Sequence, residues 1–141
     1  MSANVDTLAI IRSVGGDPLD LPFWEGCREG QFLLHRCDVC GRNYWPASLC
    51  IEHGAQSMRW VPTSGRGTLY TYTVMHHAYT SAMKSKTPYV VGVVKLAEGP
   101  FFHSNIIDCP PDAIAIDMPL EAAMTEHESG LVMPVFRPSR P

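Results

Sequence analysis

The sequence lacks any apolar run near the roughly 18–20 residues that a membrane-spanning helix needs. It also lacks a basic N-terminal region followed by an apolar core, since Leu8-Ala9-Ile10-Ile11 is too short to serve as the core of a signal peptide. These two absences predict a cytoplasmic protein with no membrane partner, in a compartment that keeps thiols reduced.

Basic charge is scarce as well. The chain has 11 Lys and Arg residues against 14 Asp and Glu residues, which gives a formal net charge of −3. A protein whose main role is to grip nucleic acid usually carries a basic surface that meets the phosphates. The charge balance therefore predicts that nucleic acid is not a partner.

The 141 residues are enough for one globular domain with a small appendage. Hydrophobic residues make up 45% of the chain and charged residues 18%, which excludes a largely disordered protein. The 11 glycines and 12 prolines favour many turns and short elements over a helical bundle.

Three regions follow from the order of the sequence patterns: an N-terminal arm at 1–17, a helix with a cysteine-rich segment at 18–62, and a β-rich region at 63–141. The arm is expected to be loose or partly helical. Asp20 is expected to cap a short helix that Gly30 ends. Phe23 and Trp24 on this helix either pack into the core or dock onto a partner protein, because aromatic residues are favoured at the centres of interfaces.

From residue 31 onward the sequence has the composition of short β-strands rather than a helical period. Short strands are expected at 32–35, 42–45 and 57–61, around the cysteines. Longer runs rich in Val, Tyr, Thr and Phe are expected to form strands at 67–77, 89–97, 101–108, 120–127 and 131–136. Five strands with this spacing predict a small closed or partly closed barrel, with a short helical or turn connection at 110–114.

Two donor pairs give the most specific signal in the chain. Cys37 and Cys40 are separated by two residues, and so are Cys50 and His53, so that two tight turns can offer four donors to one tetrahedral ion. Thiolate and imidazole donors with no open position predict a structural zinc ion without a catalytic part. Two alternatives stay open: a metal-free turn pair, and a site completed by His35 in place of His53.

Two further cysteines, Cys27 and Cys109, lie outside this pattern and are expected to be small buried apolar residues.

A set of motifs resembles a family that pairs an N-terminal helix and a rubredoxin-like zinc ribbon with a C-terminal OB-fold. This family was first catalogued as a domain of unknown function and is associated with acyl-CoA metabolism. The resemblance covers roughly residues 22–138. It rests on Pro22-Phe23-Trp24-Glu25-Gly26, Cys37-Asp38-Val39-Cys40-Gly41, Trp45-Pro46, Cys50, Trp60, Gly65-Arg66-Gly67-Thr68, Pro88-Tyr89-Val90-Val91-Gly92-Val93-Val94 and Pro134-Val135-Phe136-Arg137-Pro138.

The resemblance implies a mainly β fold, in which the helix and zinc ribbon precede a five-stranded OB-fold barrel. It also implies an accessory subunit that stabilises a thiolase-superfamily enzyme and helps to bind its coenzyme A thioester. Some family members are linked instead to MaoC-like hydratases. His53 departs from the family, which usually carries a fourth cysteine there, and this bears on metal affinity more than on the fold.

No catalytic residues are assigned from the sequence. His76 and His77 have no partner in the sequence to act as nucleophile or orienting carboxylate, and are expected to face solvent or each other. Lys84 and Lys86 lie in a polar loop at 78–87, where they either contact the phosphates of coenzyme A or are ordinary surface lysines.

Two other functions remain as alternatives. An OB-fold protein could stack nucleic-acid bases on Tyr70, Tyr72 and Phe102, against which the acidic balance counts. An independent acyl-CoA hydrolase or hydratase is disfavoured because no catalytic set is found.

Overall fold

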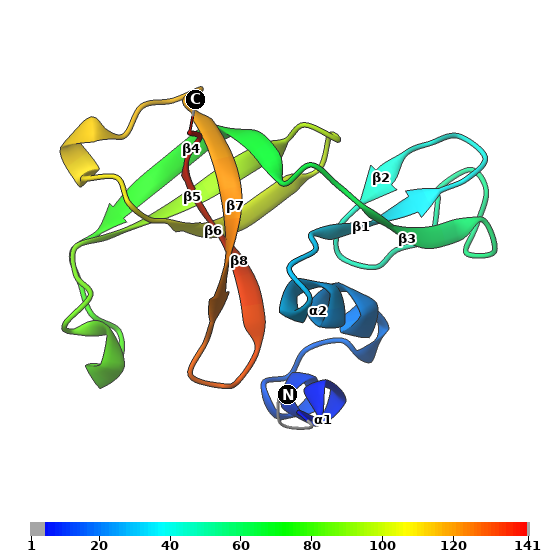
Figure 1. Ribbon diagram of the computed structural model, residues 1–141, viewed down its shortest axis with the longest axis horizontal. Coiled ribbons are helices and arrows are strands. Elements are labelled where there is room, and N and C mark those ends of the chain that lie inside the picture. The colour runs from blue at the N-terminus through cyan, green and yellow to red at the C-terminus, as the bar shows by residue number, and fades with distance from the viewer. Residues whose placement is uncertain (1–4, 141) are drawn as a thin grey trace. The chain divides into compact units, whose positions relative to one another are not determined.

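A computed structural model describes residues 5–140 (Figure 1). It contains two compact units. The first runs to Ser64 and also includes Met124–Pro134, and the second holds Gly65–Ala123 with the residues from Val135 onward. The segment Met124–Pro134, which the sequence analysis assigned to the barrel region, thus clusters with the helices and the cysteine-rich segment.

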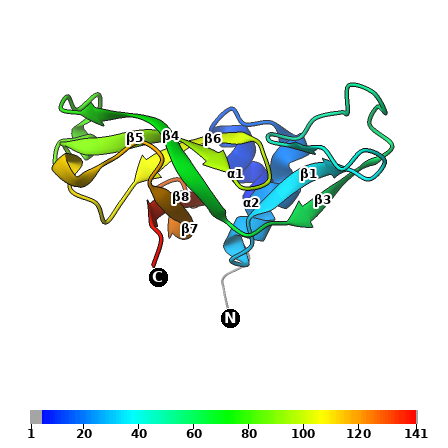
Figure 2. The same cartoon turned by 90° about the horizontal axis from the view of Figure 1, so that it is seen from above.

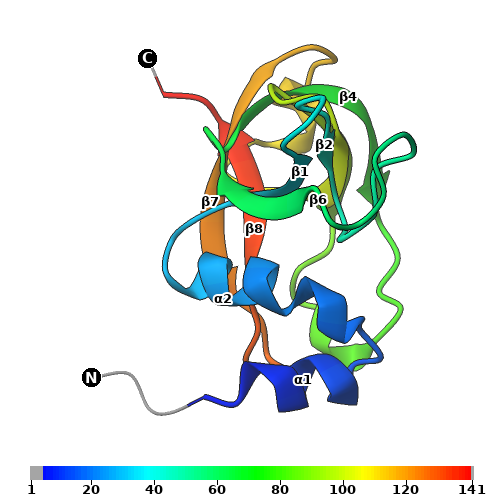
Figure 3. The same ribbon diagram turned by 90° about the vertical axis from the view of Figure 1, so that its right-hand side faces the viewer.

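Two short helices open the first unit (Figure 3). Helix α1, Thr7–Ser13, begins at Asp6, whose carboxylate accepts a hydrogen bond from the Ala9 N–H at 3.0 Å. Its Ile11 side chain is fully buried, so this part of the predicted arm is an ordered helix. The first four residues of the predicted arm lie outside the described residues. A 3-10 turn, η1 (Pro18–Asp20), leads into the second helix.

Helix α2, Leu21–Arg28, buries Phe23, Gly26 and Cys27 on one face. Asp20 stands at its N-cap position, but the expected capping bond is absent. The buried Asp20 carboxylate instead accepts a hydrogen bond from the Ala47 N–H at 2.7 Å. The prediction that Asp20 caps the helix is therefore wrong, because a distant backbone donor takes its carboxylate.

The cysteine-rich segment forms a three-stranded antiparallel sheet. It contains β1 (Leu33–Cys37), β2 (Asn43–Tyr44) and β3 (Met58–Pro62), in the order β2-β1-β3. His35 on the central strand faces Tyr44 on one side and Trp60 on the other. The three short strands predicted around the cysteines are confirmed.

Five longer strands form a barrel, and most of their residues belong to the second unit. They are β4 (Arg66–Met75), β5 (Tyr89–Leu96), β6 (Phe101–Ile106), β7 (Pro119–Glu126) and β8 (Val132–Pro138). They close into a barrel in the order β4-β5-β6-β8-β7, and pairing of β4 with β7 completes the ring. Strands β4, β5 and β6 lie side by side (Figure 2). The predicted five-stranded barrel is confirmed.

Alternation along the strands fills the barrel. In β5 the buried residues Val90, Gly92, Val94 and Leu96 alternate with more exposed ones. Phe102 on β6 is also buried, at 5% exposure, so the expectation that it could stack a base is wrong. The neighbouring Phe101 points outward and is 46% exposed. A one-residue shift along a strand changes the face, and the sequence pattern did not specify which phenylalanine faced the core.

The connections complete the fold. A 3-10 turn, η3 (Pro111–Ala113), stands where the sequence predicted a short helical or turn connection, and another, η2 (Ser81–Met83), lies in the loop between β4 and β5. Gly67 allows a close approach, because a Cβ there would lie 2.6 Å from the Lys95 carbonyl oxygen. Among the described residues, no helix has the length and apolar character to cross a bilayer.

Candidate metal centre

Two turns of the same construction hold the candidate ligands. In the first, Cys37 ends β1 and the Gly41 N–H bonds to the Cys37 carbonyl at 2.8 Å. In the second, the Gly54 N–H bonds to the Cys50 carbonyl at 2.9 Å. Gly41 and Gly54 have φ values of +74° and +72°, which residues with a Cβ rarely adopt. Each turn therefore has the pattern Cys-x2-donor-Gly. The second donor is Cys40 in the first turn and His53 in the second.

The four ligand atoms all lie within 4.8 Å of one another. The Sγ atoms of Cys40 and Cys50 are 3.7 Å apart, and the His53 Nδ1 atom lies 3.6 Å from the Cys37 Sγ and 3.5 Å from the Cys50 Sγ. Zinc bonds of about 2.3 Å to sulfur and about 2.0 Å to nitrogen place tetrahedral ligands about 3.5–3.8 Å apart. The separations between these donors therefore fit one tetrahedral zinc ion.

Hydrogen bonds favour the thiolate form of two of the cysteines. Burial opposes ionisation of Cys50, but the backbone N–H groups of Glu52 and His53 and the His53 side chain outweigh it and lower its pKa to about 6. Burial likewise opposes ionisation of Cys37, and the Ser57 hydroxyl, 3.2 Å from its sulfur, helps to lower its pKa below the usual value. A metal ion binds the thiolate, so both groups suit ligation.

The other two donors hold their protons more tightly. The Arg42 N–H lowers the pKa of Cys40, but burial and the neighbouring thiols outweigh it, and the net shift is upward. The hydrogen bond to Cys50 raises the pKa of His53. At Cys40 and His53 a metal ion therefore competes with protons more strongly than at groups of ordinary pKa.

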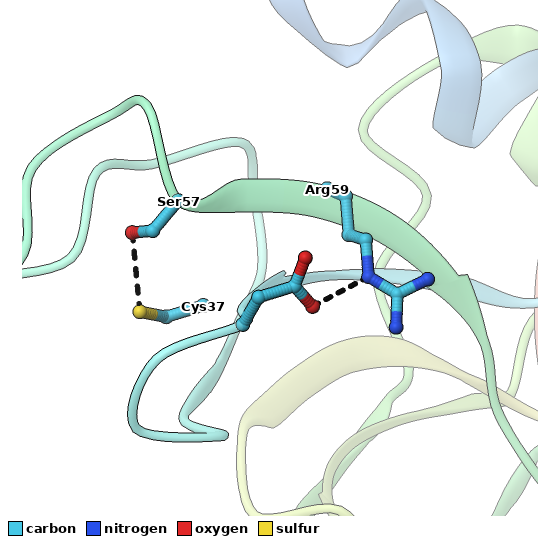
Figure 4. A network of polar contacts seen from close by, with 4 residues as sticks. Cys37, Ser57 and Arg59 are labelled. Atoms are coloured by element: carbon cyan, nitrogen blue, oxygen red, sulfur yellow. Dashed lines mark hydrogen bonds and ion pairs between the residues drawn. The ribbon is translucent and has the colours of Figure 1, made fainter.

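Strand β3 supports the first turn from outside (Figure 4). Ser57, just before β3, directs its hydroxyl at the Cys37 sulfur, and its carbonyl accepts the Asp38 N–H at 2.9 Å. Arg59 on β3 pairs with the Asp38 carboxylate. Both ion-pair partners are at least half exposed, so the pair orients the turn and adds little stability.

His35, the alternative fourth ligand, is engaged elsewhere. Its Nδ1 accepts a hydrogen bond from the Ser48 N–H at 3.0 Å, and its ring stacks on Trp60 with 4.6 Å between centroids. The cluster of ligand atoms found among the described residues contains His53 and not His35.

The two aromatic residues on α2 lie differently. Phe23 is fully buried and makes edge contacts with Trp24, Phe32 and Trp45, at centroid distances of 5.0, 5.7 and 5.2 Å. It is a core residue, as one of the two interpretations of this helix expected. Trp24 is only half-buried, and part of its surface remains open to a partner.

The residues considered for ligand binding in the β4–β5 loop are exposed. Lys84 and Lys86 make no ion pair with any described residue. His76 and His77 are also exposed, and the His77 ring contacts Tyr79 at 4.9 Å. No carboxylate or nucleophile is found against either histidine within residues 5–140.

The remaining cysteines differ from each other. Cys27 is buried as expected, and burial raises its pKa to about 12. Cys109 is half-exposed, so the expectation that it is buried is wrong. It lies in the turn after β6, beyond the residues that fill the barrel.

One charged cluster was not found from the sequence. The Glu121 carboxylate on β7 accepts the Arg140 N–H at 2.9 Å and lies 3.8 Å from the Arg137 Nε. The Arg140 hydrogen bond, aided by both guanidinium groups, lowers the pKa of Glu121. These residues are 16 and 19 positions apart, and only the β7–β8 pairing brings them together.

Comparisons with known proteins place this geometry in context. A family described as "ChsH2, C-terminal OB-fold domain" matches residues 60–125. The chain is 35% identical over 124 residues to a probable enoyl-CoA hydratase alpha subunit of Thermomonospora curvata, covering 86% of this chain but 38% of that one. It is 31% identical over 109 residues to a DUF35 domain-containing scaffold protein of Methanocaldococcus jannaschii, covering 75% and 77% of the two chains.

A solved structure is similar over almost its whole length. This is the "Ltp2-ChsH2(DUF35) aldolase", which matches with a TM-score of 0.77 and 31% sequence identity. The match covers 86% of this chain and 95% of that chain.

Proposed function

This chain belongs to the DUF35 family, and on that premise we propose that it is a zinc-binding accessory subunit of an acyl-CoA-processing enzyme. The family resemblance drawn from the sequence is confirmed by these relatives. In the proposed role, the chain stabilises a catalytic subunit of the thiolase superfamily and helps to bind its acyl-CoA, while the chemistry belongs to that partner.

The observation that carries this proposal is the likeness to the chain of the "Ltp2-ChsH2(DUF35) aldolase". The match accounts for 95% of that chain, so nearly all of it has a counterpart here. The name describes an aldolase in complex with a DUF35 chain, which supports a partner of related chemistry for the present chain. The name "scaffold protein" of the archaeal relative supports the same kind of role.

The proposed zinc ion has a structural part. Cys37, Cys40, Cys50 and His53 would fill all four tetrahedral positions, which leaves none for substrate or water. Bound zinc would join the two Cys-x2-donor-Gly turns and so hold the ends of the three-stranded sheet together. The thiolate and imidazole donors support zinc over an ion that prefers oxygen ligands.

Help in binding coenzyme A is assigned to Lys84 and Lys86. Both are exposed in the loop between the first two barrel strands, and OB-folds commonly use such loops for ligands. Lysine ammonium groups can contact phosphates as mobile point charges. The contribution of these lysines should be to substrate binding and not to the chemical step.

A hydratase-type partner is the second candidate. The 35% identity to a probable enoyl-CoA hydratase alpha subunit favours it specifically. The present chain spans only 38% of the length of that relative, so this candidate rests on the matched part alone.

Co-purification tests the proposal. The tagged chain is co-expressed with a thiolase-type enzyme and, separately, with a hydratase-type enzyme of the same organism, and each pair is isolated in high salt. Stoichiometric recovery of the thiolase-type enzyme, with more activity or solubility than it has alone, is the expected result. Recovery of the hydratase-type enzyme alone would favour the second candidate, and recovery of neither would contradict both.

Kinetics of the complex test the ligand residues. Replacing Lys84 and Lys86 together by Ala should raise KM for acyl-CoA by up to about tenfold at unchanged kcat. Lys95→Ala, which removes an exposed lysine from strand β5, serves as the matched control. His76→Ala should leave kcat within a few-fold, whereas loss of a general base would cost about 10²–10⁴ and place this chain in the active site.

A further inference from the structure

Strand β4 has one edge that its own barrel does not use. Its pairing with β5 extends over the whole strand from Gly67 to Met75, whereas its pairing with β7 ends at Thr68. At Leu69 the backbone still bonds to Asp117 and Met118. Beyond it, no backbone hydrogen bond from any described element other than β5 reaches residues 70–75.

The same segment is open to solvent on both faces. Tyr70, Thr71, Tyr72 and Thr73 are all exposed, with 57% exposure for Tyr70 and 37% for Tyr72. In a strand packed on one side, alternate residues would be buried. The backbone edge and the side chains around Tyr72 are therefore accessible together.

Beyond its first residues, this edge carries none of the usual protection against pairing. Edge strands of monomeric proteins usually bear Lys, Pro, β-bulges or inward-facing charges that prevent another strand from adding to the sheet. The irregularity between Leu69 and Thr71 disrupts the start of the free segment. From Thr68 to Met75 the strand contains no charged residue and no proline, and it is rich in the β-favouring residues Tyr, Thr and Val.

We propose that the free β4 edges of two copies of this chain pair antiparallel across a two-fold axis at Tyr72, forming a dimer with a continuous sheet. In this register Tyr72 faces its own counterpart, and Thr71 faces Thr73 of the second copy. Aromatic pairs and Thr–Thr pairs are among the cross-strand contacts that stabilise antiparallel sheets. Because the same segment is used on both sides, the contact closes as a symmetric dimer and does not propagate.

Charge favours a second copy over an unrelated strand. An edge reserved for a different protein needs a charge that repels its own copy, since copies of one chain are always present together. Each molecule carries a net charge of −3, yet the segment 68–75 is neutral, so two copies meet here without opposing like charges. The same neutrality would give no preference to a charged partner strand.

Sedimentation of the full chain loaded with zinc tests the dimer. We expect a mass of twice 15.6 kDa at about 100 µM protein, with dissociation on dilution. Thr73→Lys places a charge at the centre of the pair and should weaken dimerisation at least tenfold. Thr68→Lys is the matched control, because Thr68 is exposed on the same strand but already has neighbours on both edges.

A covalent readout tests the register. Tyr72→Cys should form a cross-linked dimer under mild oxidation, whereas Thr68→Cys and the wild type should not. A monomeric wild type at 100 µM, or equal dimerisation of Thr73→Lys and Thr68→Lys, would overturn the proposal. One further outcome would also overturn it: the chain is monomeric, and Thr73→Lys fails to bind a catalytic partner while Thr68→Lys still binds it. The edge would then serve a different chain.

Discussion

Replacing His53 by Ala is the most informative single change at the candidate metal centre. The imidazole Nδ1 lies 3.6 and 3.5 Å from two of the three sulfurs, which makes it one corner of the tetrahedron. Alanine removes this donor but leaves the three thiols and the backbone of the second turn in place. The expected result is a centre with three protein ligands and one position open to water.

The size of the effect follows from the number of donors. Structural zinc in zinc-finger peptides binds with about 10–16 kcal/mol at pH 7, so each of four donors carries about 2.5–4 kcal/mol. Loss of one donor should then weaken zinc binding by about 10²- to 10³-fold. His53→Cys restores a donor at the same position and should recover most of that affinity.

Zinc affinity is measured by competition with a chromophoric chelator, and zinc content by elemental analysis. His35→Ala is the matched control, because it removes a nearby imidazole that bonds to Ser48 and stacks on Trp60 but contacts no ligand. It should leave zinc affinity unchanged. Wild-type affinity in His53→Ala, or a loss in His35→Ala as large as that in His53→Ala, would refute the assignment of the fourth ligand.

Three further changes test other parts of the structure. Phe23→Ala should lower the free energy of unfolding by about 3–5 kcal/mol in urea, since the ring is fully buried among three aromatic side chains. Trp24→Ala should destabilise the chain less, but should weaken association with the catalytic partner by about 2 kcal/mol or more in calorimetry if this residue docks the partner. Glu121 has a pKa below its ordinary 4.5, so its carboxylate stabilises the fold above that pH, and the contribution disappears as the pH falls through the lowered value. Glu121→Gln should therefore melt below the wild type at pH 7 and together with it in acid, and an equal deficit at both pH values would contradict this.

The parts of the molecule that sequence reasoning predicted are those with local signals. The two donor turns each occupy five consecutive residues, from Cys37 to Gly41 and from Cys50 to Gly54, so their spacing alone indicates their geometry. Likewise, the alternation in β5 is visible in the chain as Val90, Gly92, Val94 and Leu96. The sequence holds one more local signal: Gly54 follows His53 as Gly41 follows Cys40, and this match distinguishes His53 from His35.

Features that depend on distant segments were not predictable in the same way. The Asp20 carboxylate bonds to Ala47, 27 residues away, and nothing near Asp20 indicates that donor. The Arg28 guanidinium contacts the Gly130 carbonyl across 102 residues and joins α2 to the turn between β7 and β8. Both residues belong to the first compact unit, whereas the boundaries drawn from the sequence placed this turn in the β-rich region, because no local signal indicates a contact with α2.

Compared with a cysteine at the same position, the histidine at position 53 changes the charge of the candidate metal centre but keeps the arrangement of its donors. Its Nδ1 atom, and not the more distant Nε2, faces the sulfurs of Cys37 and Cys50. Nδ1 is only two bonds from Cβ, so it reaches the ligand position from the same kind of turn that would otherwise present a cysteine sulfur. With zinc bound, three thiolates and a neutral imidazole give 2 − 3 = −1, whereas four thiolates would give 2 − 4 = −2. The substitution thus reduces negative charge at the end of the ribbon in a chain whose net charge is already −3, at no cost to the tetrahedral arrangement of its donors.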